Sequence, residues 1–308
     1  MRRIVFLALA LLPANAFALD YPDGAFPPTN YNAAPIQGDG LLMHVPSSAK
    51  TYTKSQIEDG FNPPDWVPKI HPPMPQVVAH GNGTTVQACA FCHLPTGTGD
   101  EQSANIAGLP LPYLIEQMHD YKSGARLGSK AMANIARAIT RADMWASANY
   151  FTSLKPRPWI RVVESATVPK TVVGAGGMRL PNPDGGIEAI GTRIIEIPEN
   201  PALALDRDPL SGFIDYVPPG SIAKGQAIVS TGDGGKIMPC GTCHGATNTG
   251  GDYVPGITGR QATSLVRQLF DMQHGDRAGT PAAMMEVTKI LSMDDIVAIA
   301  AYLASCPP

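Results

Sequence analysis

The chain of 308 residues is long enough for two small domains and the segments that connect them. Lysine and arginine total 23 and aspartate and glutamate total 26, so the formal charge of −3 argues against general nucleic-acid binding, which needs a basic surface. Thirty prolines and 31 glycines predict long irregular connections between the regular elements.

Residues 1–18 have the features of a secretory signal peptide. Arg2 and Arg3 form a short basic region, residues 4–12 form an uninterrupted apolar run, and small alanines precede residue 19. A retained membrane anchor is the alternative, but the apolar run is too short to span a bilayer. No later stretch is long and apolar enough to do so. We therefore expect an exported, soluble protein with no membrane span after signal removal, which in a bacterium means the periplasm.

Residues 19–74 form a proline-rich arm. This segment holds ten prolines, including Pro63-Pro64 and Pro72-Pro73, with Trp66 between the two pairs. The composition predicts an irregular, extended chain. We expect the arm to lie on the surface of a neighbouring domain.

Two pentapeptides carry the strongest chemical signal. Cys89-Ala90-Phe91-Cys92-His93 and Cys240-Gly241-Thr242-Cys243-His244 both match Cys-x-x-Cys-His, the attachment signature of a c-type haem. The two thiols bond to the porphyrin vinyl groups, and the adjoining histidine becomes an axial ligand of the iron. We therefore expect two covalently bound haem c groups, each with an iron. The proline-rich arm could cover an edge of one of them.

The two motifs belong to an internal repeat. Cys240 follows Cys89 by 151 residues, and the same offset aligns residues 113–126 with residues 264–277. A period of this length indicates a duplicated domain and not a solenoid of short units. The identical positions in the aligned segments are Leu114 and Leu265, Gln117 and Gln268, Asp120 and Asp271, Gly124 and Gly275, and Arg126 and Arg277.

Each unit is predicted to end in a helix with apolar periodicity, at about residues 140–154 and 292–305. Thr140 and Ser292 suit the N-cap positions of these helices. The helices place Tyr150 and Tyr302 at corresponding positions.

A short helix is also predicted before each haem motif, around residues 75–81 and 221–230. Gly81 and Gly225 lie in these segments. Such a glycine either permits a close crossing with the terminal helix or simply ends a turn, and the sequence favours neither.

Residues 156–217 separate the two units. They contain eight prolines, seven glycines and strand-like runs at 159–164 and 193–197. We interpret this segment as a linker with one or more β-hairpins, because it is too long to be a plain connector.

The second axial ligand separates electron carriers from catalysts, because Met or His closes the iron site and water or a vacancy leaves it open. Met132 and Met284 follow His93 and His244 by 39 and 40 residues. Both are expected between two helices, where a loop can fold back over a haem face, and we predict that they ligate the irons. Met285 is a competitor for Met284. Packing in the core is the alternative role, and it is the one expected for the unrepeated Met118, Met144, Met238 and Met272.

The remaining candidate ligands do not recur between the units. We therefore interpret the other histidines as surface or hydrogen-bonded residues: His44, His71, His80, His119 and His274. Cys306 lies outside both motifs and is predicted to be a free thiol, with intermolecular pairing as the alternative.

An iron-bound histidine normally donates its other ring proton to a carbonyl group. Residues 255–259, Pro-Gly-Ile-Thr-Gly, are the candidate to present this carbonyl to His244. The first unit has Ala-Asn-Ile-Ala-Gly at residues 104–108 and lacks the proline. Since proline stiffens the chain, the two haems are expected to be tuned slightly differently.

These features together resemble the class I cytochromes c, and the tandem arrangement resembles the dihaem cytochrome c4 group. The shared elements are Cys-x-x-Cys-His, Pro-x-Ile-x-Gly, a Leu-xx-Gln-xx-Asp helix ending in Gly-x-Arg, the methionine, and a terminal helix with Ala-x-Tyr. The resemblance covers about residues 75–155 and 218–306. It implies a mainly α fold with two tandem cytochrome c-like helical domains, at 75–155 and 218–308. The irregular arm and the hairpin-containing linker lie outside it, so the packing of the domains and the haem–haem distance do not follow from the resemblance.

The resemblance further implies a periplasmic electron carrier with no catalytic residue of its own. Its partners would be redox proteins, either a dehydrogenase, of which it could be the cytochrome subunit, or a terminal oxidase. The rival class is a dihaem redox enzyme, peroxidase-like or thiosulfate-oxidising, in which one haem has an open or unusual ligand beside a polar pocket. No feature of the sequence independently demands such a pocket, so the carrier is favoured.

Overall fold

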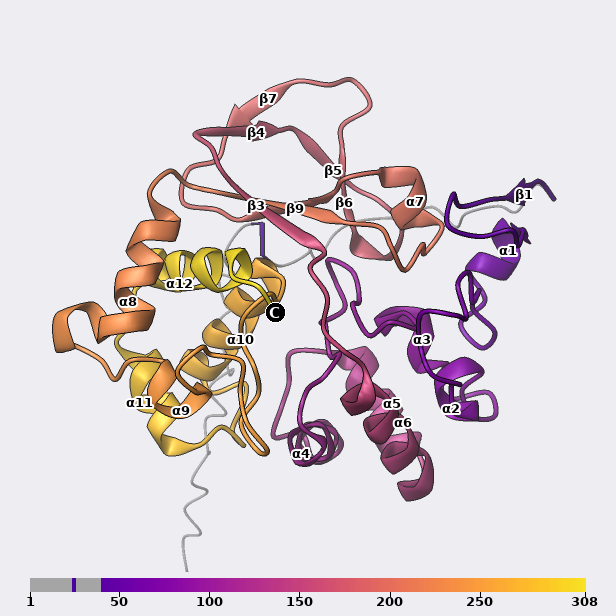
Figure 1. Cartoon of the computed structure of the whole chain (residues 1–308), viewed down its shortest axis with the longest axis horizontal. Helices are drawn as coiled ribbons and strands as arrows, with labels where there is room; N and C mark the ends of the chain where they lie inside the picture. Colours follow the sequence, from indigo (N-terminus) through magenta and orange to yellow (C-terminus); the bar gives the residue numbers. More distant parts are fainter. Residues whose placement is uncertain (1–23, 26–39) are drawn as a thin grey trace, which may run out of the picture.

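The computed structural model describes residues 24–25 and 40–308 (Figure 1). The predicted signal peptide lies outside these residues. The described part is mainly helical, and it also holds four small sheets. Within it, no helix has both the length and the apolar run needed to cross a membrane.

Each of the two repeated units contains five helices. The first consists of α2 (Gln76–Ala79), α3 (Cys89–His93), α4 (Leu111–Ser123), α5 (Lys130–Ala138) and α6 (Arg141–Ser153). The second consists of α8 (Ser221–Gly235), α9 (Gly241–His244), α10 (Ala262–His274), α11 (Ala282–Lys289) and α12 (Met293–Ser305). Helices α1 (Lys54–Ile57) and α7 (Pro201–Leu205) lie in the arm and in the insert between the units.

The terminal helices α6 and α12 begin where the sequence predicts. The Thr140 hydroxyl accepts the backbone N–H of Asp143 at 3.1 Å, and the Ser292 hydroxyl accepts that of Asp295 at 3.2 Å. Each bond satisfies a donor that the first turn of a helix leaves unpaired. The predicted N-caps are therefore confirmed.

Gly225 and Gly81 have different roles. A Cβ atom on Gly225 would overlap the carbonyl oxygen of Ala298 in α12, so glycine is what allows α8 to cross α12 at close range. Gly81 instead follows α2 with a left-handed φ of +66°, and a Cβ there would overlap the carbonyl oxygen of Val86. The first glycine permits a helix crossing and the second ends a turn.

The insert between the units is built from short strands. They are β3 (Ile160–Glu164), β4 (Thr167–Pro169), β5 (Thr171–Val173), β6 (Arg179–Pro181), β7 (Ile187–Ala189), β8 (Ile195–Pro198) and β9 (Phe213–Val217). The predicted strand-like runs form β3 and β8, which do not pair with each other. Both pair with β9, one parallel and one antiparallel, and β5 and β6 form an antiparallel hairpin.

The sheet β3-β9-β8 packs on the second unit. Ile160, Val162 and Val217 join the apolar core that α8, α10 and α12 build, and Figure 1 shows β3 and β9 lying over α12. Burying these side chains on α12 fixes the insert in place. Much of the segment that the sequence suggests as a linker is thus packed structure.

The described part of the arm is compact. Strands β1 (Leu42–Met43) and β2 (Tyr52–Thr53) pair antiparallel, and Val45, Ile57 and Trp66 are buried together in a small core. The Trp66 indole N–H donates to the carbonyl of Asp206, after α7, at 2.8 Å. The prediction of an extended arm is wrong for these residues, because burial of the indole and two aliphatic side chains favours a folded segment.

Equivalent residues of the two units meet at their interface. Arg126 and Arg277 face each other in an antiparallel bridge. Arg126 donates to Gln268 Oε1 at 2.6 Å, and Arg277 donates to Gln117 Oε1 at 2.6 Å. Reciprocal contacts of this kind are the mark of an approximate two-fold arrangement. The residues that are identical in the repeat therefore help to hold the units together.

Candidate haem sites

Each haem motif forms one short helical turn. Cys89, Cys92 and His93 all lie in α3, and Cys240 is the N-cap of α9 in the second unit. Spacings of three and four residues put the thiols and the imidazole on one side of the turn. The cysteines form no disulfides, and burial raises the pKa of Cys89 to about 12 and that of Cys240 to about 11, so both are neutral thiols. This donor set fits a covalently attached haem.

The two histidines are held in the same way. The Nδ1 atom of His93 lies 2.9 Å from the carbonyl oxygen of Ala104, and that of His244 lies 2.8 Å from the carbonyl oxygen of Pro255. A carbonyl can only accept, so Nδ1 carries the proton and Nε2 keeps the lone pair that an iron needs. Desolvation lowers the pKa of both rings, which keeps them neutral. The expected carbonyl partners are confirmed in both units.

The loop that follows each motif has the same backbone path. The N–H of Gly99 donates to the His93 carbonyl at 3.0 Å, and the N–H of Gly250 donates to the His244 carbonyl at 2.9 Å. In each loop a pair of threonine hydroxyls lies 2.9 Å apart. The loops thus share one local geometry although their sequences differ at most positions.

The surroundings of the two loops differ sharply. Residues 94–99 are all buried, whereas the corresponding residues 245–250 are half-buried or exposed. Asn105 in the first loop is 3% exposed, while Tyr253 beside the second is 75% exposed. Both histidines are half-buried, but the loop behind the first is enclosed by protein and the loop behind the second lies near the surface.

The arm and the insert cover the first motif. The Arg207 guanidinium stacks on the Phe91 ring, 3.8 Å from its centroid, and donates to the Phe91 carbonyl at 2.8 Å. It also donates to the carbonyl of Ile57 and to the carboxylate of Glu58 in the arm, both at 3.1 Å. One side chain from the insert thus fastens the arm over the helix that carries Cys92. Sequence reasoning did not single out Arg207.

The predicted methionine ligands occupy equivalent places in helices. Met132 is the third residue of α5, where its N–H donates to Ser129 Oγ at 3.3 Å, and Met284 is the third residue of α11. The expectation that they lie in loops is wrong, because Ser129 and Pro281 start helices there. Met284 and Cys240 pack against the same apolar core, and Met132 is half-buried. Their ligation of the irons stays a prediction.

Most candidates that do not recur between the units have roles in packing or hydrogen bonding, but Met238 is exposed, so its predicted packing role is wrong. Met144 is buried in the core of the first unit, and Met118 packs against it. His71 pairs with Asp65 at 3.1 Å, and His274 Nδ1 lies 2.9 Å from the Phe270 carbonyl. Cys306 is half-buried and unbridged.

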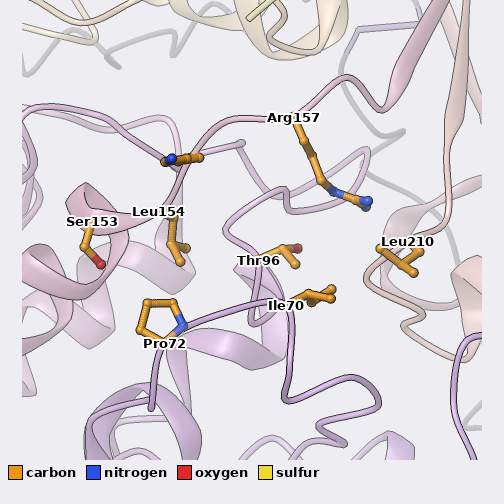
Figure 2. A pocket seen from close by; sticks show the side chains of 8 residues that line it. Ile70, Pro72, Thr96, Ser153, Leu154, Arg157 and Leu210 are labelled. Atoms are coloured by element: carbon orange, nitrogen blue, oxygen red, sulfur yellow. The ribbon is translucent and has the colours of Figure 1, made fainter.

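A cavity of about 390 Å³ opens beside the first unit (Figure 2). It lies between Ile70 of the arm, Leu154 at the end of α6, and Leu210 of the insert. Arg157 borders it and donates to the carbonyl of Pro209. None of its lining residues is a predicted haem ligand, but Thr96 among them lies in the loop that follows the first motif.

Three carboxyl groups are buried beneath the first loop, where it meets the insert and the second unit. Glu101, Glu196 and Asp215 are each at most 1% exposed. Desolvation raises the pKa of Glu101 to about 8 and that of Asp215 to about 6, and it raises that of Glu196 as well. Glu196 and Asp215 lie opposite each other on β8 and β9, and Asp215 accepts the first N–H of α10, from Ala262, at 2.8 Å. The composition of the sequence gives no hint of this cluster.

Comparisons with known proteins agree with this geometry. No protein-family model matches the chain. Cytochrome c4 of Azotobacter vinelandii is 25% identical over 240 residues, covering 73% of this chain and 87% of that protein. Cytochrome c-554(548) of Halomonas halodenitrificans is 39% identical over 72 residues, covering 23% of this chain and 87% of that protein. The chain is a dihaem class I c-type cytochrome that resembles the cytochrome c4 group. Covalently bound haem c is its cofactor, with two groups per chain as in the dihaem c4 type.

Two further similarities concern thiosulfate oxidation. The thiosulfate dehydrogenase electron acceptor of Thiomonas intermedia is 24% identical to this cytochrome over 225 residues, covering 71% of this chain and 79% of that protein. The structure of a thiosulfate dehydrogenase from Marichromatium purpuratum aligns with a TM-score of 0.50 and 26% identity over 74% of this chain. This cytochrome spans only 38% of the length of that chain.

Proposed function

We propose that this cytochrome is a periplasmic electron carrier that passes single electrons between redox partners through two haems, each ligated by a histidine and a methionine. The observation that carries the proposal is the repeated arrangement of His93 and His244, each neutral, bonded through Nδ1 to a carbonyl, and adjacent to two thiols. When bound, the haem supplies the one-electron iron couple. The chain supplies covalent attachment and a fixed imidazole at both sites, and an enclosed loop behind the imidazole at the first.

Met132 and Met284 are the proposed distal ligands. Their support is the equivalence of their positions, since each is the third residue of the helix that follows α4 or α10. A thioether favours ferrous iron, so it raises the reduction potential and closes the iron to outside ligands. A closed site suits transfer of electrons without substrate chemistry.

The proposed partner is a dehydrogenase that delivers electrons to this cytochrome. Support comes from the relative that is named as the electron acceptor of a thiosulfate dehydrogenase. A terminal oxidase would then accept the electrons. The arm and the insert lie outside the repeat and provide surface for such contacts.

The alternative is a dihaem redox enzyme, and the likeness to a thiosulfate dehydrogenase structure favours it. Such an enzyme needs one iron whose distal position is open or exchangeable. The two proposals therefore differ in one measurable property, the coordination of each iron.

A redox titration in the presence and absence of carbon monoxide or cyanide tests this. Two low-spin haems whose spectra are unchanged by either ligand are expected of the carrier. One promptly reacting, high-spin haem would support the enzyme and contradict the proposal.

A further inference from the structure

The Ala104 carbonyl, which accepts the hydrogen bond of His93, lies in a loop that side chains of the second unit hold by hydrogen bonds. We call these contacts the clamp. Gln261, at the N-cap of α10, is fully buried. Its Oε1 atom accepts the N–H of Asn105 at 2.9 Å, and its Nε2 atom donates to the carbonyls of Asp100 at 2.5 Å and Ser103 at 3.0 Å. One side chain of the second unit therefore makes three hydrogen bonds to the first loop. These bonds lie on both sides of Ala104, whose carbonyl faces His93.

Two arginines of the second unit extend this clamp. Arg260 donates to the backbone carbonyl and to Oδ1 of Asn105, at 3.1 and 2.8 Å, and to the carbonyl of Ala107 at 3.0 Å. Arg267 donates to the carbonyl of Glu101 at 2.8 Å. Hydrogen bonds from charged donors in a dry interface are among the stronger ones. Residues 100–107 thus have little freedom to move relative to α10.

The second unit clamps the first loop, but the first unit has no equivalent clamp on the second loop. At the repeat offset, Leu109 and Pro110 of the first unit replace Arg260 and Gln261, so they offer no polar side chain to the second loop. Residues 251–253 before Pro255 are exposed. The second loop keeps its shape through its own backbone bonds, the stiffness of Pro255, and a bond from Arg260 of the same unit to the Gly256 carbonyl at 3.3 Å.

We propose that Gln261 is a positioning residue for the first haem, and that through it the second unit sets the reduction potential of the first. Gln261 fixes residues 100–105 so that the Ala104 carbonyl accepts the Nδ1 proton of His93. That hydrogen bond makes the imidazole a more basic ligand, which stabilises ferric iron. This inference rests on the proposed ligation of iron by His93.

The isosteric variant Gln261→Met tests the inference in the intact dihaem protein. It keeps the side-chain volume and removes all three hydrogen bonds. We expect the potential of the first haem to rise and that of the second to stay unchanged, in a titration that follows the hyperfine-shifted methyl signals of each haem by NMR. We also expect faster hydrogen exchange at the Asn105 amide.

Gln273→Met is the matched control. Gln273 lies in the same helix and donates to the carbonyls of Thr288 and Leu291 at 2.8 and 2.7 Å, all within the second unit. This variant should leave the first potential at its parental value. Asn105→Ala is a comparison variant. It removes the Oδ1 atom that accepts from Arg260 and from the Ala107 N–H but leaves the three hydrogen bonds of Gln261 in place, so it should raise the first potential less than Gln261→Met does.

Each outcome has a defined meaning. If the parent protein lacks two low-spin haems, the proposed function fails before any variant is compared. If the parent protein has two low-spin haems, an unchanged or lowered first potential in Gln261→Met would overturn this inference alone. Equal shifts of both haems would also overturn it, because they would indicate a general loss of structure.

Discussion

The loops behind His93 and His244 have the same backbone hydrogen bonds but opposite surroundings. The second loop is half-buried or exposed along most of its length and is held by contacts within its own unit, whereas the first is bonded to Gln261 of the second unit and to Arg179 of the insert. A duplicated sequence can therefore keep the local geometry of a cofactor site while tertiary contacts give each copy a different environment. The first haem site depends on its neighbours, and the second is largely self-contained.

The strongest way to separate the two sites is to remove one haem at a time. We expect Cys89→Ala with Cys92→Ala, or Cys240→Ala with Cys243→Ala, to lower the haem content from two per chain to one, because each pair of thiols serves its own motif. Haem content per protein, measured from the pyridine haemochrome spectrum, checks this. Loss of both haems from either variant would show that the sites do not load independently.

Loss of a distal ligand should be the next largest effect. Met132→Ala or Met284→Ala should keep the covalent haem, lower the potential of that haem alone, and allow carbon monoxide to bind its iron, since the thioether is the proposed sixth ligand. Spectral titration with carbon monoxide reports each site. Met118→Ala, in the core of the first unit, is a control that should stay unreactive. Parental spectra and potentials in both ligand variants would rule out the assignment.

The buried carboxyl groups predict a pH-dependent stability at the first site. Because burial raises the pKa of Glu101 to about 8 in the folded protein, folding favours its protonated form. The contribution of protonated Glu101 to the free energy of unfolding is fully present below the ordinary glutamate pKa. It is lost as the pH rises through the pKa that Glu101 has in the folded protein. Glu101→Gln should therefore unfold like the parent near pH 4 and be more stable at pH 8, by roughly 2–5 kcal/mol.

Urea unfolding at several pH values measures this difference. Glu116→Gln, on the exposed surface of α4, is the matched control and should follow the parent profile. A Glu101→Gln profile parallel to that of the parent would show that Glu101 does not titrate in the folded protein within this range.

The smallest expected effect is that of replacing Arg207, which fastens the arm over the first haem motif. Arg207→Gln removes the contact with the Phe91 ring and the ion pair with Glu58, so it should destabilise the protein by about 1–2 kcal/mol. Limited proteolysis should then cut the arm faster. Arg161→Gln, which breaks an exposed ion pair with Glu199, is the control and should change neither property. Equal cleavage rates in the parent and Arg207→Gln would show that Arg207 does not fasten the arm.

Local signals in the sequence predicted the repeated parts of the fold well. The N-caps Thr140 and Ser292 and the carbonyl partner of His244 could be read from short segments, because each depends on a few neighbouring residues. The repeat alignment also paired Arg126 with Arg277, although it gave no reason to expect that they meet. That contact needs the relative placement of the two units, which no local pattern encodes.

The surroundings of the first site could not be predicted for the same physical reason. Gln261 and Arg207 reach their targets across 156 and 116 residues of sequence. The one signal for the clamp in the sequence is that Gln261 departs from the repeat, because the equivalent position of the first unit holds Pro110. The helical placement of Met132 was missed because the helix depends on the Ser129 cap and not on a long apolar periodicity.

A crystal structure of the oxidised, haem-loaded protein would show the ligands of both irons. We predict density that joins each iron to the Nε2 atom of His93 or His244 on one side and to the sulfur of Met132 or Met284 on the other. Water, a vacant position or a different side chain on the distal side of either iron would contradict it.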